Sequence, residues 1–266
     1  MPVRPVAPYI GGKRNLAKRL VELIEATPHQ SYGEVFFGMG GVFFRRELAP
    51  KAEAINDYGR DVANLFRVLQ RHYVAFLDML RFQLTTRTDY YRLADTRPET
   101  LTDLERAARF LYLRRTAFGG NPSGRNFGVS PSTPARFDMT KLVPMLEDVH
   151  ERLAGVTIEC LPYGEFIRRY DRPGALFFAD PPYVGNEDDY GKGLFAAEDH
   201  ARLAAELRRI KGRFILTIND VPEIRELYRG WAQIQPVKTT YTIGGGAKAK
   251  RVRELIITGR RASNGR

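Results

Sequence analysis

Four consecutive residues, Asp180-Pro181-Pro182-Tyr183, carry the clearest chemistry of the chain. They follow an apolar run at 175–179, which indicates a buried strand, and ligands of open α/β sheets bind at the carboxyl ends of strands. The two prolines fix the backbone φ angle, so the turn would hold the acid and the aromatic ring in set positions. The alternative is an ordinary strand-to-loop turn, with Asp180 as a cap and Tyr183 half buried.

The chemistry that suits these residues is methyl transfer to a planar amide or amino nitrogen. The lone pair of such a nitrogen in adenine is delocalised into the ring, so it needs hydrogen-bond acceptors that let it become more tetrahedral as it attacks a methyl sulfonium. The Asp180 carboxylate and the Pro181 carbonyl can accept these bonds, and the Tyr183 ring offers a stacking face for an unstacked base.

A second group of residues, nearer the start of the chain, favours an adenosine-containing ligand. Glycines at 38, 40 and 41 follow an expected strand at 33–37 and let the backbone approach a ligand closely. Asp57 follows the next expected strand, where an acid can hydrogen-bond ribose hydroxyls. Alone, the glycines are nearly as typical of a plain turn and Asp57 of a helix cap, so the prediction rests on the two together.

The four motifs together resemble those of the Dam-like DNA adenine methylases, since Asp-Pro-Pro-Tyr is the catalytic motif of amino-methyltransferases that act on nucleic-acid bases. Residues 8–13, Pro-Tyr-Ile-Gly-Gly-Lys, are similar to the opening motif of that family. Residues 34–40, Glu-Val-Phe-Phe-Gly-Met-Gly, resemble its Phe-x-Gly-x-Gly cofactor loop, and 55–57, Ile-Asn-Asp, its acid after the second strand. The order of the motifs matches as well, and the resemblance spans nearly the whole chain.

This resemblance implies S-adenosylmethionine as the cofactor. Tyr9, where some relatives have tryptophan, and Lys13 would touch its methionine part, with Lys13 able to meet the carboxylate. Glu165 and Phe166 occupy the position of an acid-aromatic pair near the cofactor's adenine, although Phe166 is equally well explained as core. The predicted cofactor-binding set is Tyr9, Gly11, Gly12, Lys13, Phe36, Phe37, Gly38, Gly40, Gly41, Asp57, Glu165, Phe166 and Asp180.

The charge of the chain favours a polyanionic partner. Its 266 residues include 42 Lys and Arg against 31 Asp and Glu, a net charge of +11, and each basic side chain that meets a phosphate can release a counterion. We therefore expect double-stranded DNA as the partner, held by a basic glycine-proline segment near 118–137 and by the basic region after 236, although 260–266 reads equally well as a solvated tail. The predicted DNA contacts are Arg114, Arg115, Asn121, Arg125, Asn126, Arg136, Lys248, Lys250 and Arg251.

Hydrophobic periodicity indicates an α/β chain interrupted by a helical insert. The predicted fold is a Rossmann-like S-adenosylmethionine-dependent methyltransferase sheet, mostly parallel with an antiparallel edge strand. Residues 1–72 and 154–266 would form the catalytic domain, and the mainly helical 73–153 a target-recognition insert. Expected helices are 15–26, 44–48, 62–70, 74–80, 104–116, 139–153, 164–170 and 197–211; expected strands are 33–37, 53–56, 157–161, 175–179, 214–218 and a final hairpin of 239–243 with 254–258.

Other classes of site are disfavoured by composition. The single cysteine, Cys160, excludes a disulfide framework, and the four histidines have no metal-site spacing. No apolar run approaches the roughly 20 residues needed to cross a bilayer. We therefore expect a metal-independent cytoplasmic protein with no membrane partner, acting as a monomer or weak dimer.

Three other functions stay open at this stage. The same chemistry would serve cytosine N4 methylation or methylation of RNA. A non-catalytic nucleic-acid-binding protein on a methyltransferase scaffold is a different class, and the intact Asp180, Lys13 and Asp57 speak against it. The recognised DNA sequence depends on the geometry of the insert, which composition does not reveal.

Overall fold

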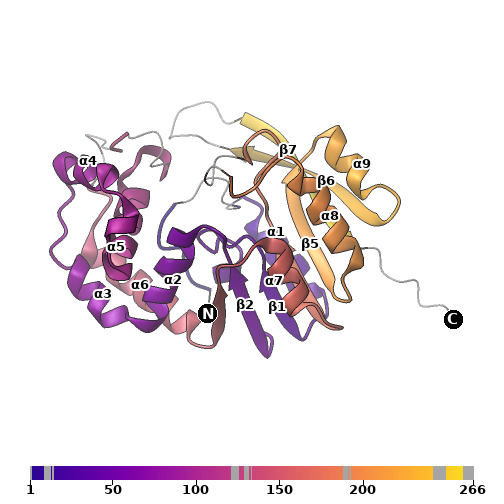
Figure 1. The fold of residues 1–266 in the computed structure, drawn as a ribbon, viewed down its shortest axis with the longest axis horizontal. Coiled ribbons are helices and arrows are strands. Elements are labelled where there is room, and N and C mark those ends of the chain that lie inside the picture. The colour runs from indigo at the N-terminus through magenta and orange to yellow at the C-terminus, as the bar shows by residue number, and fades with distance from the viewer. Residues whose placement is uncertain are drawn as a thin grey trace.

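A seven-stranded sheet forms the centre of the protein (Figure 1). The structure, a computed structural model, describes residues 2–8, 13, 15–120, 126–128, 132, 134–187, 191, 193–241 and 250–259. The strand order is β3-β2-β1-β4-β5-β7-β6. The strands are β1 (Ser31–Glu34), β2 (Ala52–Asn56), β3 (Val156–Glu159), β4 (Ala175–Ala179), β5 (Arg213–Asn219), β6 (Ala232–Tyr241) and β7 (Lys250–Gly259).

The pairing confirms the predicted fold class. Strands β3, β2, β1, β4 and β5 run parallel, and β7 lies antiparallel between β5 and β6. The final hairpin is at the sheet edge as expected, but the antiparallel strand β7 is one position in from the edge strand β6. Strand β6 begins at Ala232, earlier than the predicted start at 239, and it includes Pro236. An edge strand tolerates a proline, since no neighbouring strand needs the missing N–H.

Helices cover both faces of the sheet, and a group of them extends to one side of it (Figure 1). In that group α3, α4, α5 and α6 lie beside α2, whereas α7 and α8 lie over the other part of the sheet. The helices are α1 (Ala17–Ala26), α2 (Arg60–Arg71), α3 (Tyr73–Leu80), α4 (Arg87–Asp95), α5 (Asp103–Thr116), α6 (Met139–Leu153), α7 (Tyr163–Tyr170), α8 (Asp199–Arg209) and α9 (Pro222–Tyr228), with short 3-10 turns η1 (Phe43–Arg45), η2 (Pro98–Thr100) and η3 (Phe118–Gly120).

Strand β4 is buried on both faces, as its uninterrupted apolar sequence requires. Leu176 and Phe178 belong to the core cluster that includes residues of α1, α2, α5 and α6. Phe177 and Ala179 belong to the cluster that includes residues of α7, α8 and α9. The strand that carries the Asp-Pro-Pro-Tyr turn is therefore fixed by packing from two directions.

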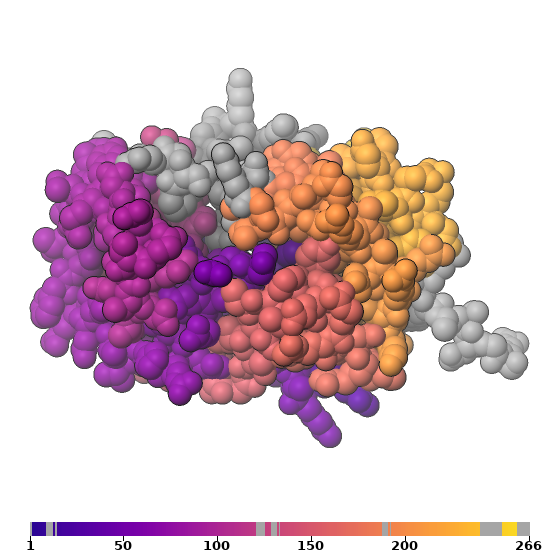
Figure 2. All heavy atoms as spheres, viewed as in Figure 1, coloured from indigo at the N-terminus to yellow at the C-terminus, as the bar shows by residue number. Residues whose placement is uncertain are grey.

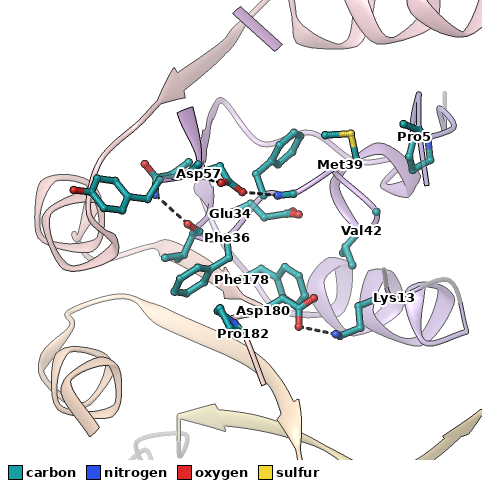
Figure 3. A pocket seen from close by; sticks show the side chains of 18 of the residues that line it. Pro5, Lys13, Glu34, Phe36, Met39, Val42, Asp57, Phe178, Asp180 and Pro182 are labelled. Atoms are coloured by element: carbon teal, nitrogen blue, oxygen red, sulfur yellow. Dashed lines mark hydrogen bonds and ion pairs between the residues drawn. The ribbon is translucent and has the colours of Figure 1, made fainter. Parts of the chain in front are cut away.

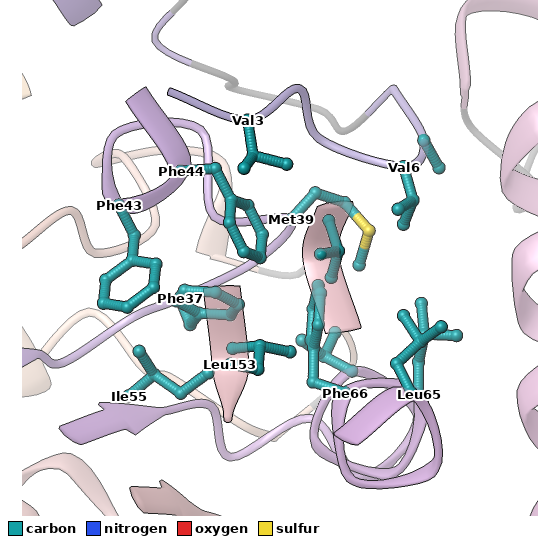
Figure 4. Close-up of a cluster of buried hydrophobic side chains, with 14 of the residues drawn as sticks. Val3, Val6, Phe37, Met39, Phe43, Phe44, Ile55, Leu65, Phe66 and Leu153 are labelled. Atoms are coloured by element: carbon teal, nitrogen blue, oxygen red, sulfur yellow. The ribbon is translucent and has the colours of Figure 1, made fainter. Parts of the chain in front are cut away.

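The segment after β1 is anchored by aromatic packing (Figure 4). The Phe37 ring contacts Phe43, Phe44 and Phe66 with centroid separations of 5.6, 5.6 and 4.8 Å. The predicted helix at 44–48 is wrong, because only the 3-10 turn η1 forms. Arg46 is extended after that turn so that its guanidinium reaches the Glu53 carboxylate at 2.8 Å.

Two helices escaped the sequence analysis. Helix α4 is mostly polar and buries a single side chain, Tyr90, so it has no apolar stripe; its start is fixed by Thr86, whose hydroxyl accepts from the Asp89 amide. Helix α9 is short and begins with Pro222 in its first turn. None of the helices in the described residues is long and apolar enough to cross a membrane.

The sheet changes direction between β1 and β4. From β1 the chain moves outward to β2 and β3, and from β4 it moves the opposite way to β5. At such a point the segments that leave the two strands diverge and open a crevice at their carboxyl ends. Residues 35–41 and 180–183 leave β1 and β4 at this crevice.

Candidate active site

A cavity of about 950 Å³ opens at the carboxyl ends of β1, β2 and β4. Figure 2 shows a hollow between the helical group and the later part of the chain, with residues from the beginning of the chain at its floor. Its volume lies in the range of small-molecule sites, about 300–1,000 Å³. Three acids from three strand ends line it: Glu34, Asp57 and Asp180.

Asp180 is held by two side chains that come from elements distant in sequence. Lys13 Nζ lies 2.7 Å from its Oδ1 (Figure 3). The Thr217 hydroxyl on β5 donates to the same oxygen at 2.8 Å. Loss of hydration raises the pKa of Asp180, while Lys13 and Thr217 act in the opposite direction. The Lys13 side chain is only 3% exposed, so this ion pair has little solvent screening.

The rest of the Asp-Pro-Pro-Tyr turn is fixed beside this pair. Lys13 Nζ also lies 4.5 Å from the centre of the Tyr183 ring. The next residue, Val184, exchanges two hydrogen bonds of 3.1 Å with the Asn219 side-chain amide at the end of β5. The turn is thus bound to β5 through Thr217 and Asn219, two residues that sequence analysis did not single out.

Asp57 is held differently, by backbone donors. The amides of Gly38 and Gly59 each donate to one of its carboxylate oxygens at 2.8 Å. Burial nevertheless raises its pKa to about 6. Its neighbour Asn56 bonds the Val35 and Leu161 carbonyls at 3.0 and 3.1 Å, which ties together the ends of β1, β2 and β3.

The predicted glycines at 38, 40 and 41 have different structural roles. Gly38 has a positive φ of 52° and lines the cavity. Gly40 also has a positive φ, 67°, but a Cβ there would meet the Phe44 ring at 2.4 Å, and Gly40 does not line the cavity. Gly41 lines the cavity with Phe36, whereas Phe37 reaches it but is mostly occupied in the aromatic core. Gly40 is therefore required for packing of the loop.

An aromatic wall closes the other side of the cavity. Phe36, Tyr163 and Phe195 lie with their ring centres 5.8 Å apart in each pair. The Tyr163 hydroxyl donates to Asp199 Oδ1 at 3.0 Å, which fixes the start of α7 against the start of α8. Sequence analysis had not singled out Tyr163, Phe195 or Asp199.

The acid-aromatic pair predicted on α7 does not reach this wall. Phe166 is fully buried and packs against Tyr170 and Phe177, in the core. Glu165 pairs with Arg169 one turn further along the same helix at 2.9 Å. Neither lines the cavity, because the rotation of α7 directs Tyr163 toward it instead.

The third acid, Glu34, is the least exposed of the three. It is the last residue of β1, is 2% exposed, and accepts a hydrogen bond of 2.8 Å from the Tyr32 hydroxyl. Figure 3 shows its side chain pointing into the cavity from between the sides that carry Asp57 and Asp180. Glu34 belongs to the cofactor-loop motif at 34–40, but the sequence analysis did not predict it as a site residue. Its buried position in the cavity lining identifies it as one.

The beginning of the chain forms a further wall that the sequence did not reveal. The Val3 amide donates to the Phe44 carbonyl at 2.6 Å. The residues of this segment that line the cavity are Pro2, Val3, Arg4, Pro5, Ala7 and Pro8. Arg115 on α5 donates from Nη1 to the Val6 carbonyl at 2.6 Å and lines the cavity itself. A residue predicted to contact DNA therefore holds the wall of the site.

The other predicted DNA contacts that are described also bond within the protein. Arg114 donates to the Gly120 carbonyl at 3.3 Å, and Arg136 donates to the Ala117 carbonyl at 3.2 Å. The Asn126 carbonyl accepts from the Phe118 amide at 2.8 Å. These residues shape the segment after α5. Tyr9, Gly11, Gly12, Asn121, Arg125 and Lys248, and the side chains of Lys250 and Arg251, lie outside the described residues.

Comparison with known proteins decides the family. A family model of D12 class N6 adenine-specific DNA methyltransferases matches residues 9–243. The chain belongs to this family. It is an adenine-specific DNA methyltransferase, and its substrate is DNA.

Relatives of this methyltransferase align along most of their length. The type II methyltransferase M1.LlaDCHI of Lactococcus lactis subsp. cremoris is 26% identical over 96% of this chain and 95% of its own. The type II methyltransferase M.CviBI of Paramecium bursaria Chlorella virus NC1A is 26% identical over 86% of this chain and 88% of its own. A DNA N-6-adenine-methyltransferase of Escherichia phage P1 is 27% identical over 85% of this chain and 31% of its own.

The cavity of the D12 methyltransferase fits a cofactor of the S-adenosylmethionine type. Asp57 offers a carboxylate that two amides hold in place, and the aromatic wall offers apolar faces. Lys13, beside Asp180, offers a cation for the carboxylate of such a cofactor. The charged residues of the described lining are balanced: the acids are Glu34, Asp57, Asp180 and Asp199, and the basic residues are Arg4, Lys13, Arg45 and Arg115.

Proposed function

We propose that the protein transfers a methyl group from S-adenosylmethionine to N6 of an adenine that has left the duplex stack and entered the cavity beside Tyr183. The arrangement that supports this best is the Lys13–Asp180–Thr217 cluster at the end of β4, with Tyr183 next to it and Asp57 across the cavity. This arrangement combines the Asp57 carboxylate, which is suited to bind ribose hydroxyls, with the Asp180 carboxylate beside the Tyr183 ring. When bound, the cofactor supplies a methyl sulfonium with a neutral leaving group.

Asp180 and the Pro181 carbonyl then accept hydrogen bonds from the adenine amino group. Two acceptors that draw on its protons concentrate the lone pair on nitrogen, so the nitrogen can attack the methyl group. The nitrogen–methyl bond forms as the sulfur–methyl bond breaks, and the methylated nitrogen then loses one proton to solvent. Thr217 keeps Asp180 oriented through its 2.8 Å bond, and Asn219 keeps Tyr183 in place through Val184. Tyr183 stacks on the extruded base, since base-aromatic stacking contributes about 1–3 kcal/mol per base.

Lys13 has two alternative partners in this scheme. It pairs with Asp180, and it is suited to the carboxylate of the cofactor's methionine part. Transfer of Lys13 toward the cofactor would leave Asp180 with only the Thr217 bond and make its oxygen available to the adenine. Asp57 binds the ribose hydroxyls at the other end of the cofactor.

Duplex DNA would be recognised by the helical insert at 73–153 and by the basic segment near 248–251. The excess of basic residues over the whole chain supports this part of the proposal. We also expect a monomer or weak dimer located in the cytoplasm. Sedimentation of the free protein and of its DNA complex tests the first of these expectations.

The test is transfer of a tritiated methyl group from S-adenosylmethionine to duplex DNA, followed by digestion and mass spectrometry of the nucleosides. We expect N6-methyldeoxyadenosine, formed by the wild type and not by Asp180→Ala. Normal activity of Asp180→Ala would overturn the catalytic assignment. N4-methylcytosine as the methylated nucleoside would contradict the assignment of adenine as the reacting base.

A further inference from the structure

We propose that the protein has a second DNA-binding surface, remote from the cavity, where the C-terminal ends of α7 and α8 meet. This surface holds a duplex through its phosphates, without regard to base sequence. Its role goes beyond the proposed methyl transfer and depends only on DNA as the substrate of the family. The surface, which we name the basic junction, consists of Arg168, Arg169, Arg172, Arg208, Arg209, Lys211 and Arg213.

Positive charge is concentrated in two short stretches of the chain. Residues 168–172 are Arg-Arg-Tyr-Asp-Arg, and residues 208–213 are Arg-Arg-Ile-Lys-Gly-Arg. Seven of these eleven residues are basic and one is acidic, whereas the whole chain has 42 basic residues against 31 acidic ones. All seven basic residues are exposed. The two stretches therefore carry far more than their share of the positive charge of the protein.

The fold brings these two stretches together. Helices α7 and α8 lie side by side on the same part of the sheet (Figure 1). The Asp171 carboxylate, just after α7, accepts hydrogen bonds of 2.9 Å from the backbone amides of Lys211 and Gly212, just after α8. The single acid of the two stretches is thus engaged with the backbone, and the basic side chains on either side of it form one surface.

Acids compensate few of these cations. Arg168 pairs with Glu206 at 2.6 Å and Arg169 pairs with Glu165 at 2.9 Å. Both pairs are exposed, so they contribute little and can exchange for a phosphate. Among the described residues, no acid forms an ion pair with the other five cations of the junction, which are Arg172, Arg208, Arg209, Lys211 and Arg213.

The basic junction lies at the edge of the sheet opposite the cavity. Arg172 precedes β4 and Arg213 begins β5, whereas Asp180 follows the other end of β4 at the cavity. A strand of five residues, such as β4, spans about 16 Å. A straight duplex held at the cavity therefore leaves the basic junction available to a second segment of DNA.

Stabilisation of the helices does not account for the whole surface. Cations in the last turn favour a helix through its dipole, which explains Arg168 and Arg169 on α7. Arg172, Lys211 and Arg213 lie outside both helices. A dense group of exposed guanidinium and ammonium groups suits the successive phosphates of a nucleic-acid backbone. Phosphate contacts carry no sequence information, so we expect binding without base readout.

The experiment counts the duplexes bound to each protein molecule. The probe is a fluorescein-labelled duplex of about 12 G·C pairs, which is too short to bend around the protein. Sedimentation velocity at low salt gives the number bound. The test variant changes three exposed residues outside the helices: Arg172→Gln, Lys211→Gln and Arg213→Gln. The matched control removes the same charge from exposed positions on α1 and before β2: Lys18→Gln, Arg19→Gln and Lys51→Gln.

We expect the wild type and the control variant to bind two duplexes, and the test variant to bind one. Methyl transfer to saturating plasmid DNA should proceed at the same rate in all three proteins, which shows that the test variant is folded. If the triple variant does not fold, each single variant should still weaken the second site several-fold. Absence of methyl transfer in all three proteins would refute the proposed function, while the number of bound duplexes would still test the basic junction.

Three results would overturn the proposal. The first is a single duplex bound by the wild type, or two bound by the test variant. The second is loss of the second duplex in the control variant as well, because net charge alone would then account for it. The third is binding of phosphatidylglycerol vesicles by the wild type, but not by the test variant, without a second duplex, which would assign the surface to a membrane.

Discussion

Asp57 and Asp180 occupy opposite sides of one cavity, but the protein holds them in different ways. Asp57 is fixed by the Gly38 and Gly59 amides, which belong to the backbone and cannot move independently. Asp180 is held by the side chains of Lys13 and Thr217. A carboxylate that serves only to bind benefits from rigid donors, whereas one that must accept new bonds during a reaction needs partners that can exchange.

The comparison gives each acid a different kinetic signature. Loss of Asp57 should weaken binding of the cofactor and leave the chemical step intact. Loss of Asp180 should damage the chemical step far more than binding, because its acceptor oxygen is required as the nitrogen attacks. The predictions below begin with the largest of these effects.

Replacement of Asp180 gives the largest expected change. Asp180→Ala should lower the rate of methyl transfer on the order of a thousandfold, since removal of one preorganised group that stabilises a transition state costs about that much. The dissociation constant for S-adenosylmethionine should change less than tenfold. Rapid-quench kinetics and calorimetry measure the two quantities. A binding defect as large as the rate defect would remove the distinction between the two acids.

Replacement of Asp57 should mainly affect affinity. Asp57→Ala removes hydrogen bonds from a charged acceptor to the ligand, each contributing about 1.5–3 kcal/mol, so we expect cofactor binding to weaken about 10- to 100-fold. With saturating cofactor the methyl-transfer rate should stay within about threefold of the wild type. A large loss of rate at saturation would mean that Asp57 contributes to the chemistry as well.

The pH dependence of binding should report Asp57 separately. Its pKa is raised to about 6, and ribose hydroxyls donate to the ionised form, so cofactor affinity should fall as the pH drops below 6 and the carboxylate becomes protonated. The affinity should fall by at most about tenfold for each unit that the pH decreases. Calorimetry from pH 5 to 6.5 measures this dependence, with Asp57→Asn as the control. An Asp57→Asn variant whose affinity falls with the same slope would assign the effect to another group.

The smallest effect concerns the orientation of Asp180. Thr217→Val keeps the shape of the side chain but removes the 2.8 Å bond to Asp180 Oδ1, worth about 1 kcal/mol, and should slow methyl transfer about fivefold. Thr258→Val, on β7 beside the other end of β5, is the matched control and should change the rate little. Equal rates for the two variants would show that Lys13 alone orients the acid.

The sequence predicts the acids of the site well where a motif and a strand end coincide. Asp57 and Asp180 both follow apolar strands, and the parallel sheet brings those strand ends to one edge. Thr217 bonds Asp180 and Asn219 bonds Val184, but both lie on β5 and share no local pattern with the Asp-Pro-Pro-Tyr motif. Their role depends on strand order, which the order of motifs along the chain does not specify.

Helix α7 shows why the acid-aromatic pair was predicted at Glu165 and Phe166, which do not line the cavity, and not at Tyr163, which does. Tyr163 and Phe166 lie less than one turn apart on this short helix, and both are aromatic. Only the rotation of the helix decides which ring enters the core, and that rotation is set by packing against Phe177. The sequence therefore predicts an aromatic contribution from α7 without identifying the residue.

The ionisation of Glu34 is a second property of the site that the sequence does not predict. Its place in the cofactor-loop motif is plain in the sequence, but its ionisation depends on burial and on charges from β2 and from the turn after β4. Such effects arise only when the sheet is assembled. The segment at 2–8 is similar, since its role as a wall follows from the Arg115 bond to Val6.

The most direct test of the two-acid account is single-turnover methyl transfer at saturating S-adenosylmethionine, with duplex DNA and the isosteric variants Asp180→Asn and Asp57→Asn side by side. The account predicts that Asp57→Asn transfers at close to the wild-type rate once saturated, and that Asp180→Asn stays slower on the order of a thousandfold at every cofactor concentration. Recovery of the wild-type rate by Asp180→Asn at high cofactor concentration would contradict it.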